Sequence, residues 1–120
     1  MLFEIERTTS FDVPVLRAVG ELDLTTSPVL AEAADADLAE RPASLVVDLT
    51  ATTFLDSSGA RTLAQLARRA AAEDVALQVV CPRRNTAVRM VIDLLDLRSV
   101  MTVLESVPGR PTVVRGEDAP

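Results

Sequence analysis

The amino-acid sequence predicts a single α/β domain with a mostly parallel sheet of four or five strands and helices mainly on one face. The chain has 120 residues, 48% of them apolar, which supports one domain with one hydrophobic core. Short apolar runs alternate along the chain with longer segments of helical periodicity. Two apolar runs near the N-terminus are separated only by a turn, which predicts an antiparallel hairpin before this alternation begins.

The chain opens with the two strands of this hairpin. Phe3 and Ile5 alternate with glutamates, which is the pattern of a half-exposed strand. Residues 10–12 form the expected turn, and the second strand follows over residues 13–19. Pro14 lies at the start of that strand, where a missing backbone N–H is tolerated.

The first helix is predicted to begin with Ser27 as its N-cap and Pro28 in its first position. It ends before Pro42, and a buried central strand follows over residues 45–49. The apolar face of this helix comprises Leu30, Ala33, Ala34 and Leu38.

The second half of the chain continues the alternation after a loop over residues 50–59. A second helix comes next, then a strand over residues 75–81, a helix from about Asn85 and a last strand over residues 100–104. The apolar faces of these two helices comprise Leu63, Ala67 and Ala70 in the first and Val88, Val91, Ile92 and Leu95 in the second. If each strand adds beside the previous one, right-handed crossovers place the helices on the same face.

The C-terminal residues are predicted to leave the fold. Pro108, Gly109 and Pro111 follow one another too closely for a helix interior, and residues 116–120 are polar and rich in helix breakers. We therefore assign residues 1–106 to the domain and residues 107–120 to a mobile tail.

Composition excludes several classes of function. The net charge of −6 disfavours attraction to nucleic acid or to an anionic membrane surface, so protein partners are expected. The chain has no His, which removes a common metal ligand and the usual activating base, so neither a metal, a cofactor nor an enzymatic activity is expected.

Cys81, the single cysteine, is expected to be a half-buried structural thiol. With no signal-peptide pattern and no apolar run of about 20 residues, the protein is expected in the cytoplasm.

The loop before the second helix contains Asp56, Ser57, Ser58 and Gly59. Aspartate and serine are both strong N-cap residues, because their side-chain oxygens accept hydrogen bonds from the first free N–H groups of a helix. One cap is enough, so three candidates leave a surplus hydroxyl, and Gly59 would give a partner close access to the backbone. A redundant cap on an ordinary loop is the alternative interpretation.

Two runs carry a family resemblance. Phe54-Leu55-Asp56-Ser57-Ser58-Gly59 after an apolar strand, with Gly20-Glu21-Leu22-Asp23 upstream, resembles the anti-sigma factor antagonists of the STAS family over about residues 3–104. The resemblance implies that the unphosphorylated protein binds an anti-sigma factor, itself a serine kinase, and frees the sigma factor. It implies further that phosphorylation of Ser58 ends this binding and that a phosphatase reverses it. We predict that Ser57 is the helix cap. The kinase, not this chain, would supply ATP and Mg.

Two carboxylates are predicted to flank Ser58, and the helix after it carries further candidate contacts. Asp23 and Asp56 follow adjacent strands of the predicted sheet, so both would flank the hydroxyl and join Ser58 in binding a partner. Turn formation and helix capping are the alternative roles of these two carboxylates. Arg61, Gln65 and Arg68, on the exposed face of the second helix, are further candidate partner contacts, and an ordinary solvated helix face is the alternative.

Three other functions compete with the switch. A STAS module could serve, without phosphorylation, in a larger assembly such as a transporter or a stress-signalling complex. A serine hydrolase is disfavoured because no His exists to accept the proton and no Gly stands two residues before either serine. Phosphate or nucleotide binding at the helix start is disfavoured because the loop has one Gly and no Lys.

Overall fold

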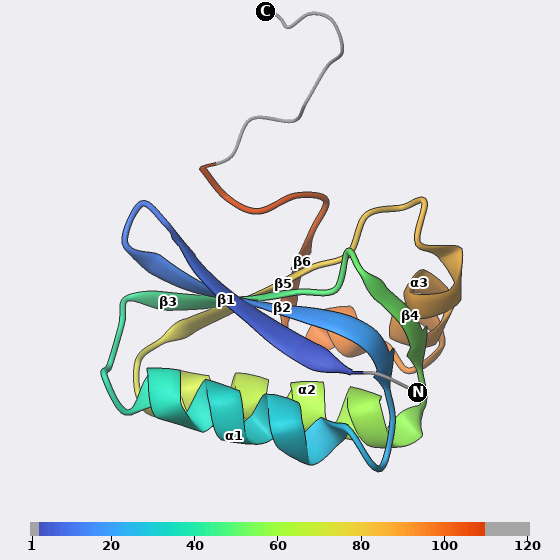
Figure 1. The fold of residues 1–120 in the computed structure, drawn as a ribbon, viewed down its shortest axis with the longest axis horizontal. Coiled ribbons are helices and arrows are strands. Elements are labelled where there is room, and N and C mark those ends of the chain that lie inside the picture. The colour runs from blue at the N-terminus through green and yellow to red at the C-terminus, as the bar shows by residue number, and fades with distance from the viewer. Residues whose placement is uncertain (1–2, 110–120) are drawn as a thin grey trace, which may run out of the picture.

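A six-stranded sheet forms the middle of the structure, a computed structural model that describes residues 3–109 (Figure 1). Its strands are β1 (Glu4–Ser10), β2 (Val13–Leu22), β3 (Ser44–Asp48), β4 (Thr52–Leu55), β5 (Ala76–Val80) and β6 (Thr102–Leu104). The helices are α1 (Ser27–Leu38), α2 (Ser57–Ala72), α3 (Thr86–Leu94) and the short 3₁₀ helix η1 (Leu97–Ser99).

The main strand order is β1-β2-β3-β5-β6, which confirms that each predicted strand adds beside the previous one. Strands β1 and β2 form the expected antiparallel hairpin, and every other neighbouring pair in this order is parallel. Leu16 lies opposite Val47, and Val47 lies opposite Val79, so the large side chains of the central strands form one continuous apolar layer.

Strand β4 is a sixth strand inside the segment predicted as a loop, so the predicted count was too low. It lies off the main order and pairs in parallel with the end of β2. The chain turns after β3 because Asp48 Oδ1 accepts hydrogen bonds from the backbone N–H and the hydroxyl of Thr50. The buried Thr52 hydroxyl then donates to the Ala18 carbonyl at 2.8 Å, which attaches β4 to β2.

Helices α1 and α2 lie side by side across one face of the sheet, as predicted (Figure 1). Their buried residues Leu30, Leu63 and Ala70 pack in the main core, where Leu16 and Val47 come from the sheet. An ion pair between Arg69 and Asp35 joins the two helices at the surface. The N-cap of α1 is Thr26 rather than Ser27, because Ser27 already lies within the helix and its hydroxyl donates to the Asp23 carbonyl at 2.6 Å.

Helix α3 packs against β4 and contributes Val88 and Ile92 to the main core. The Asn85 amide, just before α3, donates hydrogen bonds to the carbonyl oxygens of Leu49 at 3.0 Å and Thr52 at 2.8 Å. These bonds hold the turn between β3 and β4. Leu95 was predicted on the buried face of this helix, but it lies beyond the helix end and is exposed.

The segment after β6 crosses the sheet face opposite α1 and α2 (Figure 1). Val107 is buried against Val15, Val46 and Val80, and the Ser10 hydroxyl donates to the Pro108 carbonyl at 2.9 Å. Residues 107–109 therefore contact the sheet and the hairpin, whereas residues 110–120 of the predicted tail lie outside the described part of the chain. Within residues 3–109, none of the helices has the length and apolar character needed to cross a membrane.

Candidate functional site

A bend in β2 brings the segments that follow β2 and β4 to the same end of the sheet. Gly20 has a φ of 117°, a backbone conformation that residues other than glycine rarely adopt. The pairing register of β2 with β4 shifts at this residue. Before the bend β2 pairs with β3, and after it Leu22 lies opposite Leu55. Asp23 directly follows β2 and Asp56 directly follows β4. The two aspartates therefore lie at neighbouring strand ends, as expected from the sequence.

Asp56, and not Ser57, is the N-cap of α2. Its carboxylate accepts a hydrogen bond from the Gly59 backbone N–H at 2.9 Å, while Ser57 is already the first helical residue and is exposed. The prediction that Ser57 caps the helix was therefore wrong. Because β4 continues to Leu55, Asp56 is the first residue beyond the strand, and it keeps the extended backbone of an N-cap.

We expect Asp56→Ala to lower the free energy of unfolding by about 1 kcal/mol, because the Gly59 N–H loses its side-chain acceptor. Ser57→Ala should change it by less than about 0.5 kcal/mol, since the Ser57 side chain is exposed. Urea unfolding at equilibrium measures both values. Asp56→Asn is the matched variant that keeps a capping oxygen and removes the charge. A larger loss in Ser57→Ala than in Asp56→Ala would contradict the assignment of the cap.

Gly59 has a packing role that the sequence analysis did not predict. It is buried, and a Cβ at this position would lie 2.5 Å from the Leu22 carbonyl oxygen and 2.6 Å from Leu55 Cδ1. The start of α2 thus approaches the ends of β2 and β4 at a distance that only glycine permits. The expectation that Gly59 gives a partner access to the backbone was wrong, because the residue faces the core.

Ser58 is half-buried and lines an open groove of about 260 Å³ between the first turns of α1 and α2. Arg61 and Thr62 of α2 line the same groove, and α1 and the loop before it provide the opposite wall. That wall consists of Leu24, Ser27, Pro28 and Ala31. No hydrogen bond joins the Ser58 hydroxyl to another residue in the range 3–109, so it remains available at the start of α2.

Asp23 orders the loop before α1, whose Leu24 lines the groove, although Asp23 itself does not line it. Its carboxylate Oδ1 accepts hydrogen bonds from the backbone N–H groups of Thr25 and Thr26, each at 3.0 Å, and from the Thr26 hydroxyl at 3.1 Å. Hydrogen bonding by the Thr26 backbone is the main reason that the pKa of Asp23 is lowered from its ordinary value. Asp23 and Asp56 thus both serve the turn and capping roles that the sequence left open.

Comparison with known proteins now assigns this fold and loop to a family. The STAS domain family matches residues 4–110. The chain belongs to the STAS domain family. It is 35% identical, over 104 residues, to the anti-sigma-F factor antagonist RsfB of Mycobacterium tuberculosis, a match that covers 87% of this chain and 83% of RsfB.

Solved structures of anti-sigma factor antagonists are similar over most of this chain. An anti-sigma factor antagonist from Mycobacterium paratuberculosis is 29% identical and superposes with a TM-score of 0.79, covering 88% of each chain. The unphosphorylated form of the anti-sigma factor antagonist SpoIIAA is 17% identical, with a TM-score of 0.62 over 88% of this chain and 90% of that one. At that identity, the likeness to SpoIIAA shows the fold alone.

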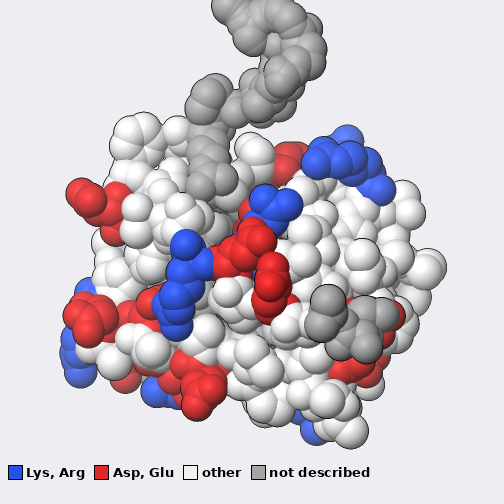
Figure 2. Space-filling view, viewed as in Figure 1, with Lys and Arg blue, Asp and Glu red and all other residues white. Residues whose placement is uncertain are grey.

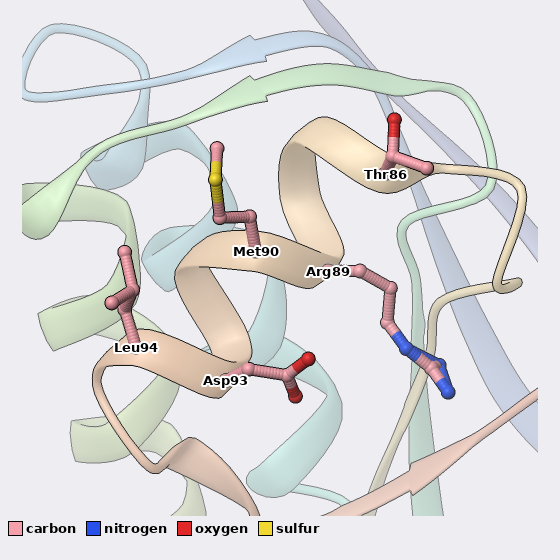
Figure 3. A pocket seen from close by; sticks show the side chains of 5 residues that line it. All are labelled: Thr86, Arg89, Met90, Asp93 and Leu94. Atoms are coloured by element: carbon pink, nitrogen blue, oxygen red, sulfur yellow. The ribbon is translucent and has the colours of Figure 1, made fainter.

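A second hollow of this STAS domain, about 440 Å³ in volume, lies along α3 (Figure 3). Met90 and Leu94 lie on one side of it and are largely exposed, while Arg89 extends away from them toward the other end. Figure 2 shows that the part of the surface over β4 and α3 carries few charged side chains, whereas acidic and basic groups mix over β1 and α1. This apolar surface was not predicted from the sequence, where only Val88, Val91, Ile92 and Leu95 of this segment were assigned a role, all on the buried face.

Cys81 differs from its predicted environment. Its side chain is fully buried at the end of β5, not half-buried, and this burial raises the pKa of the thiol. Among residues 3–109, no group of three His, Cys, Asp or Glu side chains is arranged to hold a metal ion.

Proposed function

We propose that this STAS domain is an anti-sigma factor antagonist whose unphosphorylated form binds an anti-sigma factor kinase, and that phosphorylation of Ser58 abolishes this binding. One observation carries the proposal. Asp56 caps α2, so the Ser58 hydroxyl in the groove is not needed to stabilise the helix and can be modified without cost to the fold. The relatives described above give the class of partner, since they are named antagonists of anti-sigma factors.

The chemistry requires Ser58 only as an acceptor. Its Oγ attacks the γ-phosphorus of ATP held by the kinase, an O–P bond forms, and the bond between the γ-phosphorus and the bridging oxygen to the β-phosphate breaks. ADP leaves, and a base of the kinase takes the hydroxyl proton. A phosphatase restores the hydroxyl by hydrolysis. The half-exposed position of Ser58 in an open groove suits access by both enzymes.

A phosphate at Ser58 should leave the fold intact and change its surface. The second residue of α2 lies where free N–H groups and the helix dipole favour negative charge. The surface gains about 1.5 to 2 negative charges at the helix start that the Asp56 carboxylate already caps. A partner fitted to the bare hydroxyl is then repelled and sterically blocked.

The surroundings of Ser58 suit a protein partner. Leu24, on the groove wall, is 74% exposed, and Phe54, two residues before the cap, is 46% exposed. Exposed apolar side chains beside charged groups are typical of protein contact surfaces. We assign the partner contact to Asp23, Asp56, Ser58 and Arg61 together with these apolar neighbours.

The direct test uses the purified protein and the serine-kinase anti-sigma factors of its source genome. One of them should bind the unphosphorylated protein and release its sigma factor, as measured by calorimetry and by gel filtration of the mixture. With ATP and Mg²⁺, intact mass should rise by one phosphate, and peptide mapping should place it on Ser58. Ser58→Ala should stay unmodified, whereas Ser57→Ala should be phosphorylated like the wild type.

Two results would contradict this proposal. Phosphate found mainly on Ser57 in the wild type would overturn the site, and binding that persists unchanged after stoichiometric phosphorylation would overturn the switch. Binding without any phosphorylation would favour the competing function, a passive STAS module within a larger assembly.

A further inference from the structure

Arg61 lies in the wall of the Ser58 groove without a charged partner. Its side chain is exposed, and no ion pair joins it to an acidic residue between positions 3 and 109. Arg7 pairs with Asp37 and Arg89 pairs with Glu105, each at 2.8 Å, whereas Arg68 and Arg84, like Arg61, have no ion pair within residues 3–109 but lie outside the groove. The groove therefore contains a guanidinium that is open to an incoming anion.

The stability of α2 does not require Arg61. This arginine is the fifth residue of the helix, beyond the first turn in which the helix dipole acts on charged side chains, and its side chain is exposed. An anion bound in the groove would be attracted by its guanidinium.

Ser58 and Arg61 are three residues apart on α2 and line the same groove. Helical residues at this spacing have Cβ atoms about 5–6 Å apart, within reach of a long arginine side chain. A phosphate provides acceptor oxygens that the planar guanidinium can bind in pairs. No other basic residue lines the described groove.

We propose that a phosphate on Ser58 captures Arg61, so phosphorylation withdraws a cation from the partner surface at the same position where it adds an anion. In the unphosphorylated protein the same guanidinium binds a carboxylate of the anti-sigma factor. This inference rests on the proposed function, and it adds that the partner presents an acidic side chain to the groove. The switch then exchanges one ion pair for another.

The test uses protein in which phosphoserine is incorporated at position 58 during translation, so it does not depend on a kinase. Titration followed by ³¹P NMR gives the pKa of the phosphate in wild type, Arg61→Gln and Arg68→Gln. Arg68 is the matched control, because it is exposed on the same helix two turns further on. A nearby cation stabilises the dianion, so the phosphate pKa should be about 0.5 higher in Arg61→Gln than in the other two proteins. Equal values in all three would overturn the capture.

A second measurement tests the partner carboxylate. In the unphosphorylated proteins, Arg61→Gln should weaken binding of the anti-sigma factor about fivefold to tenfold, and Arg68→Gln should change it less than about twofold. Equal affinities of Arg61→Gln and wild type would overturn this half of the inference. If no anti-sigma factor binds the wild type, the proposed function fails, and the NMR result still decides the capture independently.

Discussion

Gly59→Ala is expected to lower the free energy of unfolding by about 2 kcal/mol, although alanine is the better helix former. The added methyl group would lie 2.5 Å from the Leu22 carbonyl oxygen and 2.6 Å from Leu55 Cδ1. Overpacking of a core lowers stability by about 1 to 3 kcal/mol, and the higher helix propensity of alanine offsets about 1 kcal/mol of that loss. Because the nearer atom belongs to the backbone and cannot rotate away, we expect a cost at the upper end of that range.

Ser57→Ala is the matched control for this prediction. It changes an exposed position of the same helical turn, where nothing opposes the methyl group, and its effect should stay within about 0.5 kcal/mol. Urea unfolding at equilibrium compares both variants with the wild type. Displacement of α2 should also move Ser58, so binding of the anti-sigma factor should weaken in Gly59→Ala alone. A Gly59→Ala protein as stable as the wild type would show that the close approach of α2 is no constraint.

The architecture could be predicted because its signals are local and repeated. Apolar runs such as residues 45–49 are too short for helices, and the helices between them show clear periodicity, as in Leu63 and Ala67. Right-handed crossovers then fix the order of the parallel strands. Each of these inferences depends on many residues, so a misplaced helix start, as at Ser27, does not change the result.

Strand β4 could not be predicted, because its signals are weak. The turn before it has neither glycine nor proline and is formed instead by the Asp48 carboxylate and Thr50. The strand has four residues, of which Thr53 and Phe54 are exposed, so no alternating pattern marks it. Tertiary contacts, such as the hydrogen bond from Thr52 to Ala18, define β4 instead.

The same strand explains the errors around the candidate site. Asp56, Ser57 and Ser58 have similar capping propensities, so their sequence alone cannot select the cap. The end of β4 at Leu55 makes the selection, because it places Asp56 in extended backbone conformation directly before α2. The contact between Gly59 and Leu22 joins residues 37 positions apart, so only the folded chain reveals it. The sequence did indicate the loop and its hydroxyl, which depend on residue type and not on register.

Ser58→Asp is expected to weaken binding of the anti-sigma factor by about thirtyfold or more, because its carboxylate adds negative charge to the interface and competes with the partner for Arg61, at a cost of about 2 kcal/mol or more. The same substitution should leave the melting temperature unchanged or slightly raised. The new carboxylate lies in the first turn of α2, where the helix dipole stabilises it by about 0.3 to 1 kcal/mol. Ser58→Ala adds no charge, so it should bind nearly like the wild type and become insensitive to the kinase and ATP. Calorimetric titration and thermal unfolding of each variant provide both measurements.

Ser57→Asp is the matched control, since it adds the same charge to the same helical turn at an exposed position outside the groove. If phosphorylation acts through the groove, Ser57→Asp should weaken binding much less than Ser58→Asp, because its carboxylate stays in water when the partner binds. Equal losses in the two variants would mean that the charge of the whole surface matters and not the position of Ser58. Should Ser58→Asp bind as tightly as the wild type, the phosphorylation switch would have to be abandoned for a passive STAS module.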